Sequence, residues 1–402
     1  MRLIILYIFY LLTLTASAGN SKLSQKQFKK DISAIKSNIK NSKDLDKSET
    51  TLRKYLSDSL YAKDKSLHIL LTECLRKQYD AANEKMYLKE KVDTANTIRT
   101  NIRLFLAIEA LDSIDAMPDQ KGISSPSYRK KHAEYITPFW GNLLKGGIYF
   151  YAHSNWKEAW QCFDTYLDCH RQPLFAEEAL DSTQYNFAAF LATMAAYNIS
   201  DITLAQKYAK AAIEYTPRKE MTLQRLADLS IAKGDTASYL SYLDEGNSAF
   251  PHSGYFFPNL VDYYSKTKNL DKALDYANKA LATDSLNTTF LLARHNVQMM
   301  QQNYDGALKD GISLLAINDS LAIPNYNVAC IYFQKAQDAL KLSGKSFKQR
   351  LKLSQQYYRL CKPYIEMYRK LRPDDKALWR PILYDVYLNL NMGKEFDSLP
   401  KP

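Results

Sequence analysis

Apolar residues recur at spacings of three and four along most of this chain, a pattern that indicates amphipathic helices rather than strands. From Trp140 onward the apolar runs come in pairs, and turn-forming segments such as Lys233-Gly234-Asp235 separate the two runs of a pair. Glycine and proline are scarce, with 12 and 13 residues, which also favours long helices joined by short connections. The pattern therefore predicts an all-α chain.

The helix pairs repeat with a period of about 34 residues. Counted from Glu220, units begin again at Gly254, Thr288 and Ala322. Two columns of the second helix read Tyr239, Ala273, Ala307 and Leu243, Ala277, Gly311. Small residues in these columns let helix axes approach closely. Because one pair cannot bury its apolar face alone, we expect the pairs to stack around a continuous core.

Further units begin near Asn186 and Trp140, with extra residues between them around 174–184. The last unit ends at Pro373 and is longer than the others, which places an insertion around 335–353 between its two helices. A helix over Leu378–Leu390 is expected to cap the array, and a loose tail to follow it.

These columns resemble the tetratricopeptide repeat, most clearly in Leu260, Tyr264, Ala273, Tyr276, Ala277 and Ala280. The resemblance covers roughly Trp140–Met392. It implies an α-solenoid, a right-handed superhelix of helix-turn-helix units whose concave face is lined by the first helices. Arg294 and His295 depart from the pattern, because they replace an apolar and a small residue, and they call the packing of their helix into question.

Residues 19–135 read as a divergent helical region in front of an array over 136–375, with a cap and tail over 376–402. The divergent region has three apolar stripes, which are Phe28, Ile32, Ile35, Ile39; Leu67, Leu70, Leu71, Cys74, Leu75; and Ile98, Ile102, Phe105, Leu106, Ile108. Segment 117–126 is the clearest loop. The general layout resembles exported tetratricopeptide-repeat proteins of the Bacteroidetes.

The amino end has the pattern of a secretory signal peptide over residues 1–18. A basic start at Arg2 precedes an uncharged apolar run, Leu3–Thr15, and Ala16-Ser17-Ala18 forms a cleavage site before Gly19. The alternative is an uncleaved anchor, but the run is shorter than the roughly 20 residues of a spanning helix. We expect an exported protein, periplasmic or secreted, with no integral membrane segment.

The net charge of +11 is uneven along the chain. Segment Lys341–Arg372 holds ten basic residues and one acid, Glu366. Its candidate basic patch is Lys341, Lys345, Lys348, Arg350, Lys352 and Arg359. Two interpretations stay open: a solvated face of long helices, or a contact surface for an acidic protein, glycan or lipid headgroup. Nucleic acid is not an expected partner of an exported chain.

Residues for catalysis, metal or cofactor binding do not form any familiar motif. The six histidines make no HExxH pair, and Ser343-Gly344-Lys345-Ser346 lacks the first glycine of a phosphate-binding loop. Cys162 and Cys169 lie seven apart in a helix, about 10 Å and beyond disulfide reach. Whether Cys330 and Cys361 pair stays open. We expect no enzyme activity, no cofactor and no metal site.

The leading hypothesis is a non-enzymatic scaffold of the cell envelope that binds a protein or peptide partner on its concave face. By the family resemblance, the groove-facing candidates are Ile148, Tyr151, Phe190, Met194, Tyr197, Asp228, Asp262, Asn296 and Tyr326. The alternative is an accessory protein that binds carbohydrate or an envelope polymer, which exposed Tyr and Trp clusters would favour. An enzyme of unrecognised type is the third hypothesis.

Overall fold

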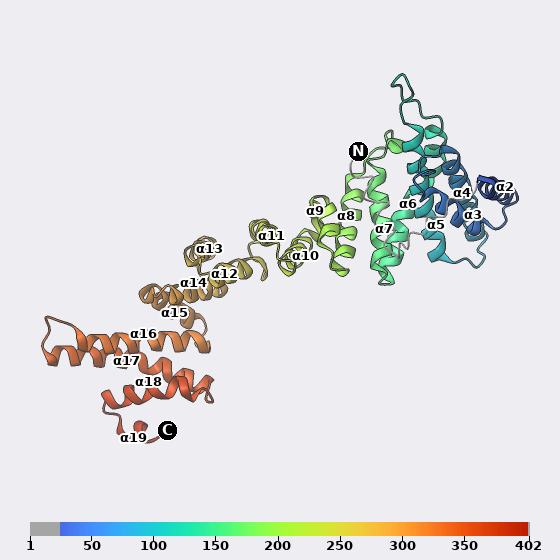
Figure 1. Cartoon of the computed structure of the whole chain (residues 1–402). Helices are drawn as coiled ribbons and strands as arrows, with labels where there is room; N and C mark the ends of the chain where they lie inside the picture. The colour runs from blue at the N-terminus through green and yellow to red at the C-terminus, as the bar shows by residue number, and fades with distance from the viewer. Residues whose placement is uncertain (1–24, 401–402) are drawn as a thin grey trace. The chain divides into compact units, whose positions relative to one another are not determined.

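The computed structural model describes residues 25–400, and all regular structure in that range is helical (Figure 1). The signal peptide expected over residues 1–18 lies outside the described residues. Two compact units make up the chain, one ending at Thr222 and the next beginning at Leu223.

Over residues 25–222, the first unit stacks eight α-helices in chain order. They are α2 (Gln25–Asn41), α3 (Leu45–Leu56), α4 (Lys65–Tyr87), α5 (Thr94–Asp115), α6 (Arg129–Ala152), α7 (Trp156–Cys169), α8 (Ser182–Asn198) and α9 (Ile202–Ile213), with short 3₁₀ helices η1 (Pro173–Phe175) and η2 (Thr216–Arg218). Each α-helix packs mainly on the helices before and after it in the sequence. This is the stacking that the paired apolar runs predict.

The second unit continues the same arrangement. Helix α10 (Lys219–Ala232) crosses the boundary and is followed by α11 (Thr236–Ala249), α12 (Phe256–Lys266), α13 (Leu270–Thr283), α14 (Thr288–Met300), α15 (Tyr304–Ile317), α16 (Ala322–Lys341), α17 (Phe347–Leu371), α18 (Lys376–Asn389) and α19 (Gly393–Asp397). The predicted all-α solenoid is confirmed. A right-handed superhelix for the whole chain stays a prediction.

The turn inside each helix pair has one backbone geometry that recurs at the predicted period. Its central residue has a positive φ of 57° to 77° in five successive pairs, at Ser154, Ser200, Gly234, Lys268 and Gln302. The last four are spaced by 34 residues. In each turn the next residue donates its backbone N–H to a carbonyl five positions earlier, as in Asn303 to Gln298 at 2.9 Å. This bond closes the first helix with a left-handed cap.

Two predicted starts, Thr288 and Ala322, coincide with the first residues of α14 and α16. The side chain of Asn287 accepts hydrogen bonds from two N–H groups of α14, which fixes that start. Helix α6 begins at Arg129, so the boundary expected at residue 135 lies inside a continuous helix.

The His295 ring occupies a column that holds small residues in the other units, and the structure resolves how it packs. His295 is fully buried, with Nδ1 2.7 Å from the Ala307 carbonyl and Nε2 3.0 Å from Asn327 Nδ2. A carbonyl can only accept, so Nδ1 donates to it and Nε2 accepts from the Asn327 amide. Gly311 makes room for the ring, since a Cβ there would lie 3.1 Å from His295 and 2.7 Å from Val328.

The insertion around 335–353 extends both α16 and α17, as the sequence predicts. Residues 342–346 connect them, and Ser346 begins α17 with a capping box to Gln349. Helix α18 takes the place of the expected cap. The prediction of a loose tail after this cap is wrong. Phe396 of α19 packs on Tyr384, and Arg380 Nε donates to the Pro400 carbonyl at 2.6 Å.

The amino-terminal stripes are largely buried as expected, with one exception. Leu106 is 38% exposed, whereas Leu104, which is not part of the predicted stripe, is fully buried on α5. The predicted loop over 117–126 lies between α5 and α6.

Candidate binding pocket between α4 and α6

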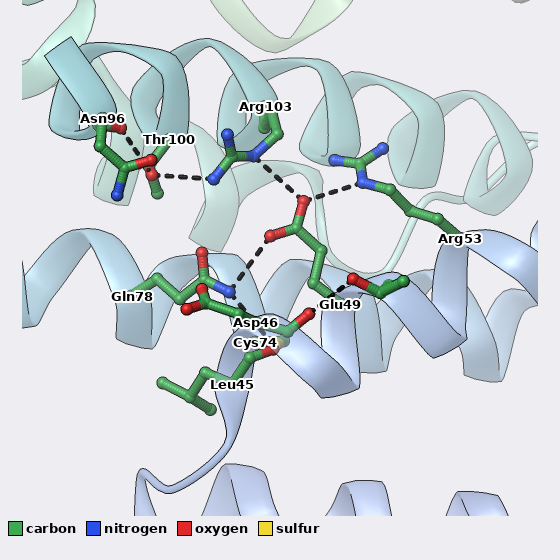
Figure 2. A network of polar contacts seen from close by, with 10 residues as sticks. Leu45, Asp46, Glu49, Arg53, Cys74, Gln78, Asn96, Thr100 and Arg103 are labelled. Atoms are coloured by element: carbon green, nitrogen blue, oxygen red, sulfur yellow. Dashed lines mark hydrogen bonds and ion pairs between the residues drawn. The ribbon is translucent and has the colours of Figure 1, made fainter. Parts of the chain in front are cut away.

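A buried carboxylate joins α3, α4 and α5 in the first unit (Figure 2). Glu49 on α3 lies 2.8 Å from Arg53 Nε and 3.0 Å from Arg103 Nε, and Gln78 on α4 donates to it at 3.1 Å. The Glu49 residue is 7% exposed. Because breaking a buried ion pair leaves an uncompensated charge, this network holds the three helices in one arrangement.

Cys74 adjoins this network, but it is not placed for chemistry. Its thiol is fully buried and donates to the Leu45 carbonyl at 3.2 Å. Burial raises the pKa of Cys74 to about 12, and nearby Glu49 adds to the rise. The reactive form of cysteine is the thiolate, so this group is a structural one at neutral pH.

A pocket of about 340 Å³ opens on the neighbouring surface, between α4 and α6. Both are the first helices of successive pairs. Ile69, Ile108 and Leu111 supply its apolar lining. The polar and aromatic lining comes from Thr72, Glu73, Arg76, Tyr128, Lys131, His132, Glu134 and Tyr135.

Arg76 and Tyr135 form one wall of the pocket. The Arg76 guanidinium carbon lies 4.7 Å from the centre of the Tyr135 ring, and the Tyr135 hydroxyl donates to Asp80 at 2.7 Å. Arg76 Nε is 3.6 Å from the same carboxylate. Burial and the Asp80 hydrogen bond both raise the Tyr135 pKa. The phenol is therefore neutral, and the three side chains brace one another across α4 and α6.

Tyr128 and His132 form the other aromatic part of the lining, with stacked rings 5.8 Å apart. Asp115 accepts the Tyr128 backbone N–H at 2.8 Å, and Asp112 accepts three hydrogen bonds from Nε and Nη2 of Arg129. These contacts fix the start of α6 against α5. Burial lowers the His132 pKa, with Lys131 as the next cause, so the ring is neutral at pH 7.

Among the described residues, two buried polar atoms of the lining, Thr72 Oγ1 and His132 Nδ1, have no hydrogen-bond partner. Thr72 is 3% exposed. A buried polar atom without a partner costs free energy, and such atoms concentrate where a ligand or water supplies the missing bond.

Taken together, the pocket has an apolar floor and a rim that carries both signs of charge. Glu73 and Lys131 are exposed on this rim, from α4 and α6 respectively. An apolar centre within a polar rim is the arrangement of a protein-binding hot spot. A second hollow of about 470 Å³ lies at the turns 268–271 and 301–303, but Leu270 is the one apolar residue in its lining.

The groove candidates predicted in the first unit divide by burial. Ile148 is 42% exposed, while Tyr151 and Tyr197 are half-buried. Phe190 and Met194 are only 8% and 5% exposed. The prediction is wrong for these two, because the alanine-rich helix α8 is packed on both sides by α7 and α9 and its large side chains fill that core.

The candidates in the second unit are held by local contacts. Asp228 accepts the Tyr255 hydroxyl, and Asp262 pairs with Lys266 at 2.7 Å. Asn296 is exposed. The ring of Tyr326 packs at a tilt on buried Tyr368, with centroids 4.9 Å apart, so it belongs largely to the core around α17. The nine candidates are split between the two units and do not form one described site.

The basic patch lies on the α16–α17 hairpin. Lys345, Lys348, Lys352 and Arg359 are exposed, Lys341 lies 3.4 Å from Asp338, and Arg350 is half-buried. Cys330 and Cys361 are free thiols, and the Cys361 thiol donates to the Ala329 carbonyl at 3.2 Å.

The pocket residues were not among the sequence-based candidates, because the repeat columns could not be aligned before Trp140. A local signal exists. Arg76 and Asp80 stand four apart on one helix, and Tyr128, His132 and Tyr135 lie on one face of the next first helix. Within residues 25–400, no cluster of His, Cys, Asp and Glu is arranged to hold a metal ion, and no helix has the length and apolarity to cross a membrane.

No family model and no curated protein matches this chain in sequence. One similar solved structure is the C-terminal part of a TPR repeat-containing protein of Cytophaga hutchinsonii, with 13% identity, coverage of 61% of this chain and 93% of that chain, and a TM-score of 0.36. PilF of Pseudomonas aeruginosa has 13% identity, coverage of 61% and 97%, and a TM-score of 0.33. A tetratricopeptide repeat protein of Parabacteroides merdae has 12% identity, coverage of 62% and 98%, and a TM-score of 0.33. These similarities are weak, and the helices and turns of the chain itself carry the assignment of its fold as an all-α solenoid.

Proposed function

We propose that this protein is a non-enzymatic scaffold that holds a protein or peptide partner in the pocket between α4 and α6. The observation that carries the proposal is a pocket whose rim carries both signs of charge and whose apolar lining includes the partly exposed Ile69, with Ile108 and Leu111 fully buried. Burying one large apolar side chain of a partner there contributes about 1.5–3 kcal/mol. The rim charges then select partners whose own charges are complementary.

The proposal predicts a peptide with an apolar anchor flanked by polar residues. The braced Arg76–Tyr135 wall is preorganised, so little side-chain entropy is lost on binding.

Selection from a library of displayed peptides, followed by fluorescence anisotropy with the selected peptides, tests this function. The variant Lys131→Glu reverses one rim charge, and Lys145→Glu makes the same change at an exposed position of α6 outside the pocket lining. We expect about ten-fold weaker binding for Lys131→Glu and unchanged binding for Lys145→Glu. Equal affinities for the two variants would contradict the proposal.

We also propose that the scaffold acts in the cell envelope after export. The support is the pattern of residues 1–18, a basic start, an apolar run and Ala16-Ser17-Ala18. Amino-terminal sequencing of the mature protein should begin near Gly19. An intact Met1 on the mature protein would overturn this part of the proposal.

The carbohydrate-binding alternative would need clusters of exposed aromatic rings. Trp160 and Trp379 are buried, and Trp140 and Trp156 are half-buried. The tryptophans thus favour packing roles, and no observation in the described residues raises this alternative above the scaffold.

A further inference from the structure

The end of the α16–α17 hairpin is the most exposed segment of the second unit that is also strongly charged. We define the hairpin tip as residues 341–349, all of which are exposed. Figure 1 shows α16 and α17 side by side, with their connecting loop beyond the end of α18. The hydrophobic cluster of this unit reaches Ala336 on α16 and Tyr358 on α17 in the direction of the tip.

The charge of this hairpin has one sign. Between Asp338 and Glu366 there is no acidic residue, and the basic residues are Lys341, Lys345, Lys348, Arg350, Lys352, Arg359 and Lys362. Lys341 is offset by Asp338 at 3.4 Å. In the part of the chain that the structure describes, Lys345, Lys348 and Lys352 form no ion pair with an acidic side chain. Their charge is therefore available to an anionic partner.

The tip also exposes apolar surface among these lysines. Phe347, the first residue of α17, is 68% exposed, and Leu342, the first residue of the connection, is 39% exposed. The capping box between Ser346 and Gln349 fixes the first turn of α17, so Phe347 is held as the first residue of a helix. A large aromatic side chain that stays exposed to water contributes no hydrophobic stabilisation to the fold.

We propose that the hairpin tip binds the surface of an anionic lipid bilayer. The lysines are attracted to the negatively charged headgroups, and Phe347 and Leu342 enter the boundary between headgroups and acyl chains. An acidic protein would also satisfy the lysines, but the apolar side chains of the tip stand at its fully exposed end and not inside a charged rim, which fits entry between headgroups. The combination of aromatic and lysine therefore favours lipid. This inference does not depend on the pocket between α4 and α6.

The sizes of the two contributions set the expected effects. Each lysine close to an anionic surface strengthens binding about five-fold, so Lys345→Gln with Lys348→Gln should weaken it about 25-fold. Removing the Phe347 ring by Phe347→Ser should weaken binding about ten-fold or more. Both changes lie at exposed positions, so thermal unfolding should be unchanged.

Vesicle co-sedimentation of the chain from Gly19 onward tests the proposal, with phosphatidylcholine vesicles that contain or lack phosphatidylglycerol. This chain lacks the apolar segment Leu3–Thr15, which could bind lipid by itself, so binding reports on the tip. We expect binding that requires phosphatidylglycerol. It should be lost at about 1 M salt, where the screening length is about 3 Å.

A matched control has the same change in net charge elsewhere in the second unit. Lys266→Gln with Lys279→Gln removes two exposed lysines from α12 and α13, and it should leave vesicle binding unchanged. Equal losses in the control and tip variants would overturn the proposal, because net charge alone would then explain binding. Equal binding of the wild-type protein to vesicles with and without phosphatidylglycerol would overturn the proposal as well. An acidic protein would then be the better partner.

Discussion

Arg294 on α14 and Asp310 on α15 form a two-point ion pair, with Nε 2.7 Å from Oδ2 and Nη2 2.7 Å from Oδ1. The Asp310 side chain is 3% exposed. Thirty-four residues earlier the same two positions hold Leu260 and Tyr276. In this unit a pair of opposite charges therefore stands at the positions that hold Leu260 and Tyr276 in the preceding unit, and the buried Asp310 explains why Arg294 departs from its column.

Removing one partner of this pair should be costly. Asp310→Asn leaves the Arg294 guanidinium without a matching charge in a mostly buried place, and we expect a loss of about 2–3 kcal/mol in the free energy of unfolding. The double variant Arg294→Leu with Asp310→Tyr copies the preceding unit and should be more stable than Asp310→Asn. Urea unfolding measures both, and a double variant no better than the single would contradict this interpretation.

Two glycines of α6 predict opposite effects of the same substitution. A Cβ at Gly147 would lie 2.3 to 2.8 Å from three ring atoms of fully buried Phe163, whereas at Gly141 nothing lies within 4 Å. Gly147→Ala should destabilise by about 1–3 kcal/mol through overpacking. Gly141→Ala should stabilise by about 0.5–1 kcal/mol, because alanine favours the helix. Thermal unfolding compares them, and two shifts of the same sign would show that α7 packs differently.

Substitutions to and from glycine at the left-handed turns inside the helix pairs should change the free energy of unfolding in opposite directions. Gly234 has a φ of +77° with open space around it, so Gly234→Ala should cost about 1 kcal/mol from the backbone alone. Gln302 has a φ of +60°, and Gln302→Gly should stabilise by up to about 1 kcal/mol.

The neighbouring residue provides the control for these turns. Gln301 has a φ of −78° and its side chain donates a hydrogen bond to Asp271 at 2.9 Å, so Gln301→Gly should destabilise by about 0.5–1 kcal/mol. Urea unfolding of the three variants separates backbone strain from lost contacts. A stabilising Gln301→Gly would argue against the turn geometry.

Glu109 should make stability depend on pH. Burial raises the pKa of this carboxyl to about 8, with nearby Asp168 as the next cause, and the Cys169 thiol lies 3.8 Å away. The folded protein then keeps the proton between about pH 4.5 and pH 8, while the unfolded chain releases it. In this window the folded state binds more protons, so the free energy of unfolding falls as pH rises.

Glu109→Gln removes this titration and should flatten the decline by up to about 1.4 kcal/mol per pH unit. The control Glu134→Gln changes an exposed carboxyl and should leave the slope as it is. Unfolding in urea at several pH values gives the comparison. An unchanged slope for Glu109→Gln would show that the carboxyl is already ionised in the folded protein.

Much of this fold could be predicted from the order of residues. The period of the apolar runs places the helix pairs, and Thr288 and Ala322 begin helices where the columns begin. The insertion lengthens α16 and α17 as expected. These features succeed because each depends on contacts within one helix or between helices adjacent in the chain, which a local pattern reports.

Tertiary contacts decided which side chains are buried and which hydrogen-bond partners they have. Phe190 and Met194 look like groove residues by position, yet packing of α8 between its neighbours buries both. The sequence likewise gives no sign that His295 finds a carbonyl and an amide, or that Gly311 leaves it room. The pocket between α4 and α6 joins residues up to 66 positions apart. A repeat pattern determines which helices stack, but the three-dimensional packing determines which side chains remain at the surface, because a side chain is covered by whatever neighbour fits beside it.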